Sequence, residues 1–348
     1  MTMNYSSNKM GKILVSVVIC GYNREDFIRD AVNSILKQTL DKIFLEIVVV
    51  TNYEMQELTK LMMDAQCDFT ILQGADEPLG SYYSKAINVA RGNIISFLDD
   101  DDEFAPEKLD YIVDKFDKYP DLVFINNDVV VIDSYGNQLR NMENDFRFKS
   151  GRTSEILLDA KNPDLCYEAI RRHGNFCNSS ISVKKSKIKD YDEFLKHVAG
   201  AEDDFFFFSS LFSGGKLLIS ERKLTYYRVH SKNKSTYVKV NLMEALQRMR
   251  IDMPKTLHSL ESALEVSHIQ KAENCCCYTA LHTYYEILET FSATNFERAR
   301  MLHLMIRYIK AKPWKLSSSH RKALLISALS LISISISRNF YRAFGLGK

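Results

Sequence analysis

The chain has 348 residues, of which 46% are hydrophobic and 26% charged, so it can bury a large core and is not a disordered polypeptide. Its 46 Lys and Arg against 44 Asp and Glu leave a formal net charge of +2, which by itself argues neither for nor against a polyanionic partner. We predict no nucleic-acid partner.

Targeting signals and cysteine usage indicate a cytoplasmic location. Residues 1–12 are polar, lack the apolar core of a signal peptide and are expected to form a flexible N-terminus. No stretch approaches the roughly 20 apolar residues that cross a bilayer. The seven cysteines include no CxxC pair, which favours a reducing compartment in which they act as small core residues.

Residues 13–98 alternate between two kinds of apolar pattern. Short β-branched runs predict buried strands, and apolar residues at helical spacing predict helices between them. The strands are expected at 13–20, 45–50, 69–72 and 94–98, and the helices at 25–38, 54–65 and 84–91, the last closed by Gly92. This alternation is typical of a doubly wound α/β fold, with a Rossmann-like, mostly parallel sheet and helices on both faces.

Four carboxylates, Asp99 to Asp102, follow the strand predicted at 94–98. Like charges at one strand tip repel unless a cation or hydrogen-bond donors compensate them. Ligands of open α/β sheets bind at the carboxyl ends of strands, and hard divalent cations prefer carboxylate oxygens. The alternative is a solvated acidic loop that caps the helix expected to begin at Pro106.

The second half of the chain has a less regular pattern. A helix is predicted at 106–119, strands at 122–126, 128–133, 216–219 and 224–228, and no clear assignment is made for 137–200. Four consecutive phenylalanines, Phe205 to Phe208, indicate the buried side of a helix. Beyond residue 241 long helical segments are expected to be broken by Pro254 and Pro313, so a domain boundary is placed near 240.

Five motifs occur in order over roughly residues 13–235. They are Val15–Arg24 with its Tyr-Asn-Arg turn, Ala31–Thr39 (AVNSILKQT), Ala90–Asp102 with its Asp-x-Asp pattern, Tyr191–Leu195 with Glu202-Asp203, and Tyr227–Ser231 (YRVHS). Together they resemble the family 2 glycosyltransferases, inverting enzymes with the GT-A fold. The resemblance implies a GT-A catalytic domain at 13–240, divided into a nucleotide-sugar-binding half (13–102) and an acceptor-binding half (103–240). A helical region at 241–348 would follow it.

The resemblance further implies a hexosyltransferase that moves a sugar from a nucleoside diphosphate sugar to a hydroxyl of a glycan or lipid-linked acceptor. Mn²⁺ or Mg²⁺ would be held by Asp101 and His230, and Asp203 would be the general base. The donor would contact Tyr22, Asn23, Arg24, Asn52, Lys85, Asp99 and Asp100.

One segment departs from the family pattern. Where the family usually carries an acidic Asp-Asp-Gly-Ser turn after the second strand, this chain has Thr51-Asn52-Tyr53-Glu54. Asn52 can hydrogen-bond a base or ribose but brings no negative charge. The alternative function is therefore a non-catalytic GT-A-like binding or scaffolding module. A nucleotidyltransferase ranks third, because Gly21–Arg24 is too short and too poor in glycine for its phosphate loop.

Three assignments keep a structural alternative. Lys85 either faces the diphosphate or is a solvated helix lysine. Arg228 either pairs with phosphate or stays inside the fold. Asp203, with Glu202 and Asp204, can also stabilise the N-terminal turn of the following helix, where acidic side chains are favourable.

The C-terminal segment from residue 323 to residue 336 predicts a short apolar helix with a serine stripe. From Arg298 onward there are eleven Lys or Arg and no acidic residue. A basic, apolar helix can lie in a membrane interface and favour anionic lipid, which would suit peripheral association and a lipid-linked acceptor. Alternatively, the helix packs on the rest of the protein.

Overall fold

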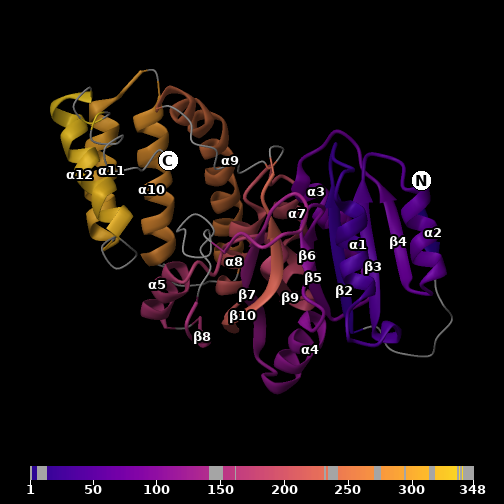
Figure 1. The fold of residues 1–348 in the computed structure, drawn as a ribbon. Helices are drawn as coiled ribbons and strands as arrows, with labels where there is room; N and C mark the ends of the chain where they lie inside the picture. The colour runs from indigo at the N-terminus through magenta and orange to yellow at the C-terminus, as the bar shows by residue number, and fades with distance from the viewer. Residues whose placement is uncertain are drawn as a thin grey trace.

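The structure, a computed structural model, describes residues 2–5, 14–140, 152–160, 162–230, 233, 242–269, 276–293, 295–312, 318–334, 337 and 339. Figure 1 shows a central sheet with helices around it and, at the end of the molecule away from the N-terminus, a group of C-terminal helices. The fold is α/β with a helical C-terminal region, as predicted.

The N-terminal half contains four parallel strands in the order β4-β3-β2-β5. They are β2 (Val15–Gly21), β3 (Leu45–Thr51), β4 (Asp68–Gln73) and β5 (Ile94–Asp99). Every residue of β2 and β3 is buried, because helices cover both faces of the sheet. Cys20 pairs with Asp99 and Gly21 with Thr51, so the carboxyl ends of these strands meet at one edge.

The complete sheet is mixed, because antiparallel strands join the parallel ones. Antiparallel β9 (Ile181–Lys184) lies between β5 and β7 (Leu122–Ile132), and β10 (Lys216–Arg228) runs parallel to β7. β6 (Glu103–Phe104) and β8 (Ile156–Asp159) both pair antiparallel with β10. β9 has only four residues, and its polar Ser182 lies opposite Ser96 of β5. Its sequence therefore gives little indication of a strand.

Two pairs of predicted strands are each one long strand. Polar Asn127 was expected to separate the two halves of β7, but it is buried and its amide donates to Thr225 Oγ1 at 3.0 Å. The strands predicted at 216–219 and 224–228 are likewise one strand, β10, whose register with β7 is irregular near Lys223. Strand β7 continues through Asn127 because a side-chain hydrogen bond to the neighbouring strand holds its amide nitrogen.

Residues 1–12 were expected to be flexible, whereas Thr2–Tyr5 forms strand β1, which pairs antiparallel with β4. Residues 1 and 6–13 lie outside the described part of the chain. The N-terminal strand therefore extends the parallel half of the sheet at its outer edge.

The helices cover both faces of the sheet, as predicted. Helices α1 (Ile28–Leu36), α2 (Gln56–Asp64) and α4 (Lys108–Lys118) pack in one apolar cluster, and α3 (Leu79–Val89) and α8 (Glu202–Phe212) in the other. Phe205 to Phe208 are all fully buried, so α8 is apolar on every side rather than on one. The second cluster also includes α5 (Pro163–Arg171).

Four helices make up the described C-terminal region. They are α9 (Leu242–Ile269), α10 (Cys276–Ser292), α11 (Arg298–Lys310) and α12 (Ser318–Ile332). Pro254 lies inside α9 instead of breaking it, while Pro313 and the predicted boundary near 240 lie outside the described residues. The apolar cluster beneath α8 continues into α9, α10 and α11. No described helix is both long and apolar enough to cross a bilayer.

Gly92 permits a close approach between two strands rather than closing α3, which ends at Val89 with Ala90 as its C-cap. A Cβ at position 92 would lie 2.6 Å from the backbone nitrogen of Ser16 and 2.8 Å from the carbonyl carbon of Val15. We expect Gly92→Ala to lower the free energy of unfolding by about 1–3 kcal/mol, since backbone cannot yield as a side chain can.

Urea unfolding measures this change. Gly200→Ala is the matched control, because its Cβ would meet only flexible Lys255 side-chain carbons, at 3.3 Å. Equal unfolding free energies for the two variants would contradict the packing argument.

Candidate active site

Loops from three strand ends converge at the carboxyl edge of the sheet. β2 leads into Tyr22–Arg24, β3 into Asn52 and β5 into the acidic turn Asp99–Asp102. Adjacent parallel strands place these loops side by side, although 29 residues separate Asn23 from Asn52. The segments that the sequence assigned to one site therefore lie side by side.

The acidic turn is buried, contrary to the alternative of a solvated loop. Asp100, Asp101 and Asp102 are only 3%, 5% and 1% exposed. Arg24 forms ion pairs with Asp100 and, at 2.6 Å, with Asp101. Burial raises the pKa of Asp100 to about 7 even though the Arg24 guanidinium opposes the shift. The turn thus concentrates negative charge that one guanidinium only partly compensates.

Asp101 and His230 lie together, although 129 residues separate them. His230 Nε2 is 2.9 Å from Asp101 Oδ2, and both side chains are almost entirely buried. The Asn233 amide also donates to that carboxylate oxygen, at 3.2 Å, and the Phe27 ring packs on the imidazole with centroids 4.7 Å apart. His230 follows the end of β10, and its imidazole therefore lies beside the acidic turn, as the sequence predicted.

Asp102 has a different environment and a structural role. Its Oδ2 accepts from the Ser179 hydroxyl at 2.6 Å and from the Cys177 thiol at 3.6 Å, and its Oδ1 accepts from the Arg228 backbone N–H at 2.8 Å. Burial, together with the charges of Asp101 and Asp99, raises its pKa well above the ordinary value. Both oxygens accept hydrogen bonds from the protein, so Asp102 links the acidic turn to Cys177, Ser179 and the end of β10.

Arg228 stays inside the fold, which decides between the two readings of that residue. It is 1% exposed, its Nε donates to the Asp101 carbonyl at 2.8 Å, and its guanidinium pairs with Glu103. The guanidinium also lies over the Phe27 ring, 4.8 Å from the centroid. Its contacts hold the backbone of the acidic turn.

Asp203 lies in the first turn of α8 and reaches the same cluster through Cys177. Its Oδ2 accepts from the Cys177 backbone N–H at 3.2 Å, next to the thiol that contacts Asp102. Asp204 is buried and accepts from the Asn175 amide at 2.6 Å, and Glu202 is also buried. Of these three acidic residues, only Asp203 is half-buried. It lies both in the first turn of a helix and next to the acidic cluster, so the two predicted locations are the same place.

Cys177 and Ser179 are components of the site that the sequence did not reveal. Ser179 accepts from the Asp99 backbone N–H at 2.9 Å as well as donating to Asp102. Both residues lie in a segment, 137–200, without a readable pattern. A single serine or cysteine in such a segment carries no signal, because its partners lie some 75 residues away.

The two asparagines at the ends of β2 and β3 bind each other. Asn52 Oδ1 accepts from the Asn23 backbone N–H at 3.1 Å, and the Asn52 amide donates to Asn23 Oδ1 at 2.7 Å. Asn23 has a φ of +55°, a conformation that asparagine tolerates better than most residues. Tyr22 donates to Asp76 at 2.8 Å, which brings a carboxylate to this side of the site.

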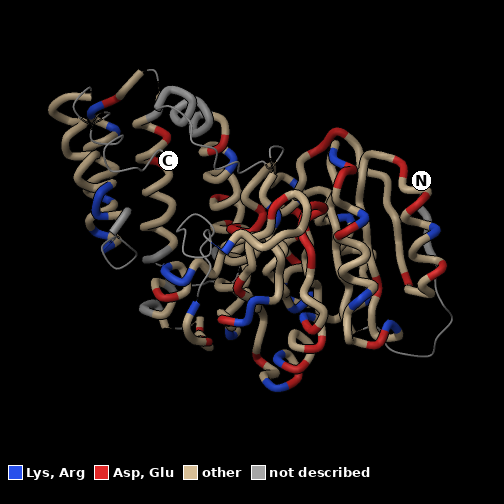
Figure 2. The backbone as a smooth tube through the Cα atoms, in the orientation of Figure 1, with Lys and Arg blue, Asp and Glu red and all other residues tan. Residues whose placement is uncertain are grey.

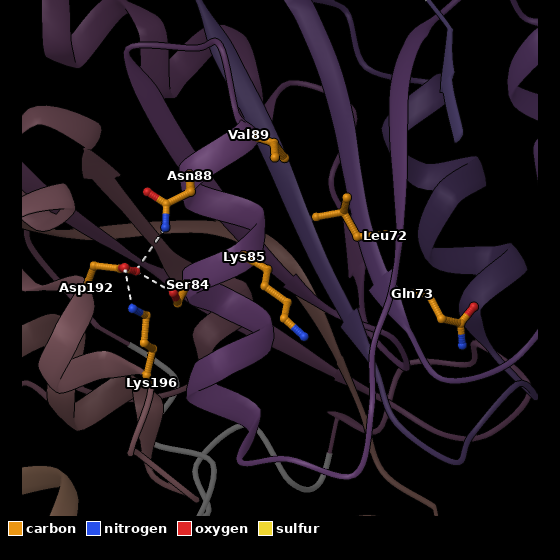
Figure 3. A pocket seen from close by; sticks show the side chains of 8 residues that line it. All are labelled: Leu72, Gln73, Ser84, Lys85, Asn88, Val89, Asp192 and Lys196. Carbon is orange, nitrogen blue, oxygen red and sulfur yellow. Dashed lines mark hydrogen bonds and ion pairs between the residues drawn. The ribbon is translucent and has the colours of Figure 1, made fainter. Parts of the chain in front are cut away.

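Lys85, which was predicted to contact the nucleotide-sugar donor, lies apart from the acidic turn. It pairs with Glu77 and lines a cavity of about 440 Å³ with Leu72, Gln73, Ser84, Asn88, Val89, Asp192 and Lys196. Figure 3 shows Lys85 pointing from α3 towards Gln73, while Asp192 binds Ser84, Asn88 and Lys196 on the other side of the helix. No ion pair joins Lys85 to the acidic turn within the described part of the chain.

Three potential metal ligands lie close together at the acidic turn. Among described side chains, ligand atoms of Asp99, Asp102 and Cys177 lie within 4.8 Å of one another. Burial keeps the pKa of the Cys177 thiol well above its ordinary value, and a protonated thiol is a poor ligand for Mg²⁺ or Mn²⁺. Asp102 already accepts hydrogen bonds at both oxygens. Asp101 Oδ2 likewise contacts Arg24, His230 and Asn233, so a cation at either carboxylate would have to displace protein partners.

A buried lysine supports the floor of this site. Lys108 is fully buried, donates to the Ser179 carbonyl and, at 3.0 Å, to Thr225 Oγ1, and lies 3.8 Å from the centroid of the Phe104 ring. Burial lowers the pKa of Lys108 to about 7. It therefore positions Ser179, which in turn holds Asp102.

Lys108→Met is expected to remove a pH dependence of stability. The unfolded chain keeps this proton to about pH 10, whereas the folded chain loses it near pH 7. Between these values the unfolded state binds more protons, so the free energy of unfolding contributed by Lys108 rises with pH. Urea unfolding of both proteins between pH 7 and 9 measures the difference, and parallel pH curves would contradict the shifted pKa.

Comparisons with known proteins agree with this geometry. Residues 16–174 match the family described as Glycosyl transferase family 2. A glucosyl-dolichyl phosphate glucuronosyltransferase of Haloferax volcanii is 31% identical over 121 residues, or 33% of this chain and 38% of the relative. An uncharacterized glycosyltransferase of Haemophilus influenzae is 23% identical over 325 residues, covering 85% of this chain and 93% of the relative.

Solved structures share the fold over nearly the whole chain. S. aureus TarS 1-349 in complex with UDP has a TM-score of 0.57 at 16% identity, with 97% of this chain and 92% of that chain covered. Its complex with UDP-GlcNAc has a TM-score of 0.56 at 15% identity, with 97% and 93% covered.

Proposed function

We propose that this chain, whose residues 16–174 match the family 2 glycosyltransferases, is an inverting, metal-dependent glycosyltransferase. It transfers a sugar from a nucleoside diphosphate sugar to a hydroxyl of a glycan or lipid-linked acceptor by direct displacement. The observation that supports this best is the convergence of Asp203 with the acidic turn through Cys177. A base and a leaving-group site within one cluster are what such a displacement requires.

The base acts on the acceptor. A sugar hydroxyl is a poor nucleophile until its proton is removed, so a positioned carboxylate is needed as the new bond forms. Asp203 accepts that proton while the hydroxyl oxygen bonds to the anomeric carbon, and the anomeric C–O bond breaks with its electrons leaving on the diphosphate. Attack on the face opposite the leaving group inverts the anomeric centre.

The acidic turn and its neighbours receive the donor. Asp101 and His230 are the residues that we propose to hold Mn²⁺ or Mg²⁺, which when bound neutralises charge on the departing diphosphate. Arg24, with its guanidinium against Asp100 and Asp101, is positioned to exchange one of these partners for a phosphate oxygen. In this proposal Asp99 and Asp100 contact the nucleoside part of the donor.

In this proposal uncharged side chains bind the nucleoside. Asn23 and Asn52 present amides at the strand ends, and Tyr22 brings a hydroxyl already bonded to Asp76. Asp76 is a candidate source of the negative charge that the Thr51-Asn52 turn lacks. Lys85 remains a proposed diphosphate contact that would have to leave Glu77 to serve. UDP in the TarS complexes makes UDP-sugars the first donors to test.

The acceptor and its location are proposed together. The Haloferax relative's name describes a substrate linked to dolichyl phosphate, which supports a lipid-linked acceptor for this chain. A catalytic domain that meets such an acceptor needs access to a membrane surface. We therefore propose peripheral association with an anionic membrane surface through the C-terminal helices, at its cytoplasmic face.

Thermal unfolding with nucleotides tests the proposal. UDP with Mn²⁺ is expected to raise the Tm, since a ligand at 100 times its Kd stabilises the native state by about 2.7 kcal/mol. A smaller rise is expected from UDP without metal, and a shift with GDP instead of UDP would change the donor but not the mechanism. The absence of any shift with all nucleoside diphosphates would contradict a donor site.

A further inference from the structure

The outward surfaces of α11 and α12 are unusually apolar. Of the nine large hydrophobic residues described as exposed in the whole structure, five lie on these two helices, namely Leu302, Ile306, Ile309, Leu325 and Ile332. The two helices pack against each other and against α10. Scattered exposed hydrophobics need no explanation, but a concentration on neighbouring helices marks an interaction surface.

Helix α12 is turned with its polar stripe inwards. Ser327 and Ser330 are fully buried and donate to backbone carbonyls of their own helix, whereas Leu325 and Ile332 are 46% and 73% exposed. The helix also packs on the rest of the protein, as the alternative expected, through Ala323 and Ile326, which are buried with the serines. A helix that faces only water would place its serines outwards, whereas this one leaves a leucine and an isoleucine on its outward surface.

Helix α11 adds a second apolar stripe, bordered by positive charge. Leu302, Ile306 and Ile309 follow helical spacing and are about half exposed, while Met301, Leu304 and Tyr308 on the other side are buried. The helix contains four basic residues and no acidic one. In Figure 2 the tube of α11 and α12 is correspondingly tan and blue.

A cavity lies beside this stripe. It has a volume of about 420 Å³ and is lined by Thr279 of α10 and by His303, Ile306, Arg307, Lys310 and Ala311. Arg307 is paired with Glu286 at 2.8 Å, so Lys310 provides the positive charge not already matched by a described carboxylate, and the His303 imidazole adds a polar group beside it. One wall is apolar and continuous with Ile306, and the other carries hydrogen-bond donors.

We propose that α11 is a contact surface for anionic phospholipid, with the lipid phosphate in the cavity against Lys310 and His303. The acyl chains then lie along Leu302, Ile306 and Ile309, and the outward face of α12 extends the apolar contact. This inference rests on the proposed membrane-facing function and assigns its lipid contact to α11, which the sequence did not single out. Charge complementarity selects anionic lipid over a neutral bilayer, because each basic residue at an anionic surface favours binding.

Vesicle co-sedimentation of the full chain tests the assignment. The vesicles are phosphatidylcholine alone or phosphatidylcholine containing about one quarter phosphatidylglycerol, and the wild type should bind only the second. The double variant Ile309→Ser/Lys310→Glu should bind at least about tenfold more weakly, since it loses apolar contact and reverses a charge. Met63→Ser/Lys60→Glu, exposed on α2, is the matched control and should bind as the wild type does.

Other outcomes overturn the assignment. Equal binding of the α11 variant and the wild type does so, as does loss of binding only in Leu325→Ser/Ile332→Ser, which would leave the membrane contact on α12 alone. A wild-type dimer in light scattering that the α11 variant disrupts, without vesicle binding, would make the surface a self-association site. The Tm shift with UDP and Mn²⁺ is measured on every variant, so that failure of the lipid contact and failure of the donor site are distinguished.

Discussion

Asp203→Asn is expected to lower kcat for sugar transfer by about 10²- to 10⁴-fold, the contribution of a positioned general base, while the affinity for the nucleotide is retained. The amide is isosteric and can still accept from the Cys177 backbone N–H, so the first turn of α8 keeps its anchor. An amide cannot take the proton of the acceptor hydroxyl at neutral pH. Initial-rate kinetics with a UDP-sugar and an acceptor, together with the Tm shift caused by UDP, measure both parts.

Two comparisons make this test specific. Asp117→Asn, the same change at an exposed position of α4, should leave kcat and Tm unaltered. Asp204→Asn, one residue further along α8, changes a buried carboxylate that binds Asn175 and should lower stability more than it lowers the rate per folded molecule. A wild-type kcat in Asp203→Asn would remove this residue from the mechanism.

Asp101→Asn is expected to lower kcat by about 10²- to 10³-fold, in the range measured when one electrostatic contact to a transition state is removed. It should also abolish the part of the UDP-induced Tm shift that depends on Mn²⁺. The neutral amide removes one of the charges that attract the cation, but it leaves an oxygen for Arg24 and Asn233. Thermal unfolding with and without Mn²⁺, followed by kinetics at saturating metal, measures each effect.

The neighbouring carboxylate provides the contrast. In Asp102→Asn one amide hydrogen must face the donors that now bind both carboxylate oxygens, so the ligand-free protein should lose about 1–3 kcal/mol of stability. The Mn²⁺-dependent shift should persist in the fraction that folds. If Asp101→Asn destabilises the protein and Asp102→Asn abolishes the metal effect, the assignment of the two roles is reversed.

The sequence predicted the first four parallel strands well because each is a short β-branched run between polar segments. The strands at 45–50 and 94–98 were placed to within a residue of β3 and β5. Local patterns could not supply β9, whose four residues derive their place from pairing with β5 and β7. They also misplaced the end of α9, because Pro254 is held within a helix that packs on α8.

The same division applies to the site. The resemblance to the family 2 glycosyltransferases implied that the acidic turn, the Tyr22–Arg24 loop, Asp203 and His230 belong to one site. Strand order accounts for the first two, since the ends of β2 and β5 meet at one edge of the sheet. Which protein groups hold a carboxylate of the turn depended on contacts across more than 70 residues, from Ser179, Cys177 and Arg228 to Asp102. The sequence by itself determined the chemistry available to this protein, because composition and strand order are local properties. Only the tertiary structure decided how that chemistry is distributed, and which face of α12 points outwards, because burial and hydrogen-bond partners are settled when distant segments pack.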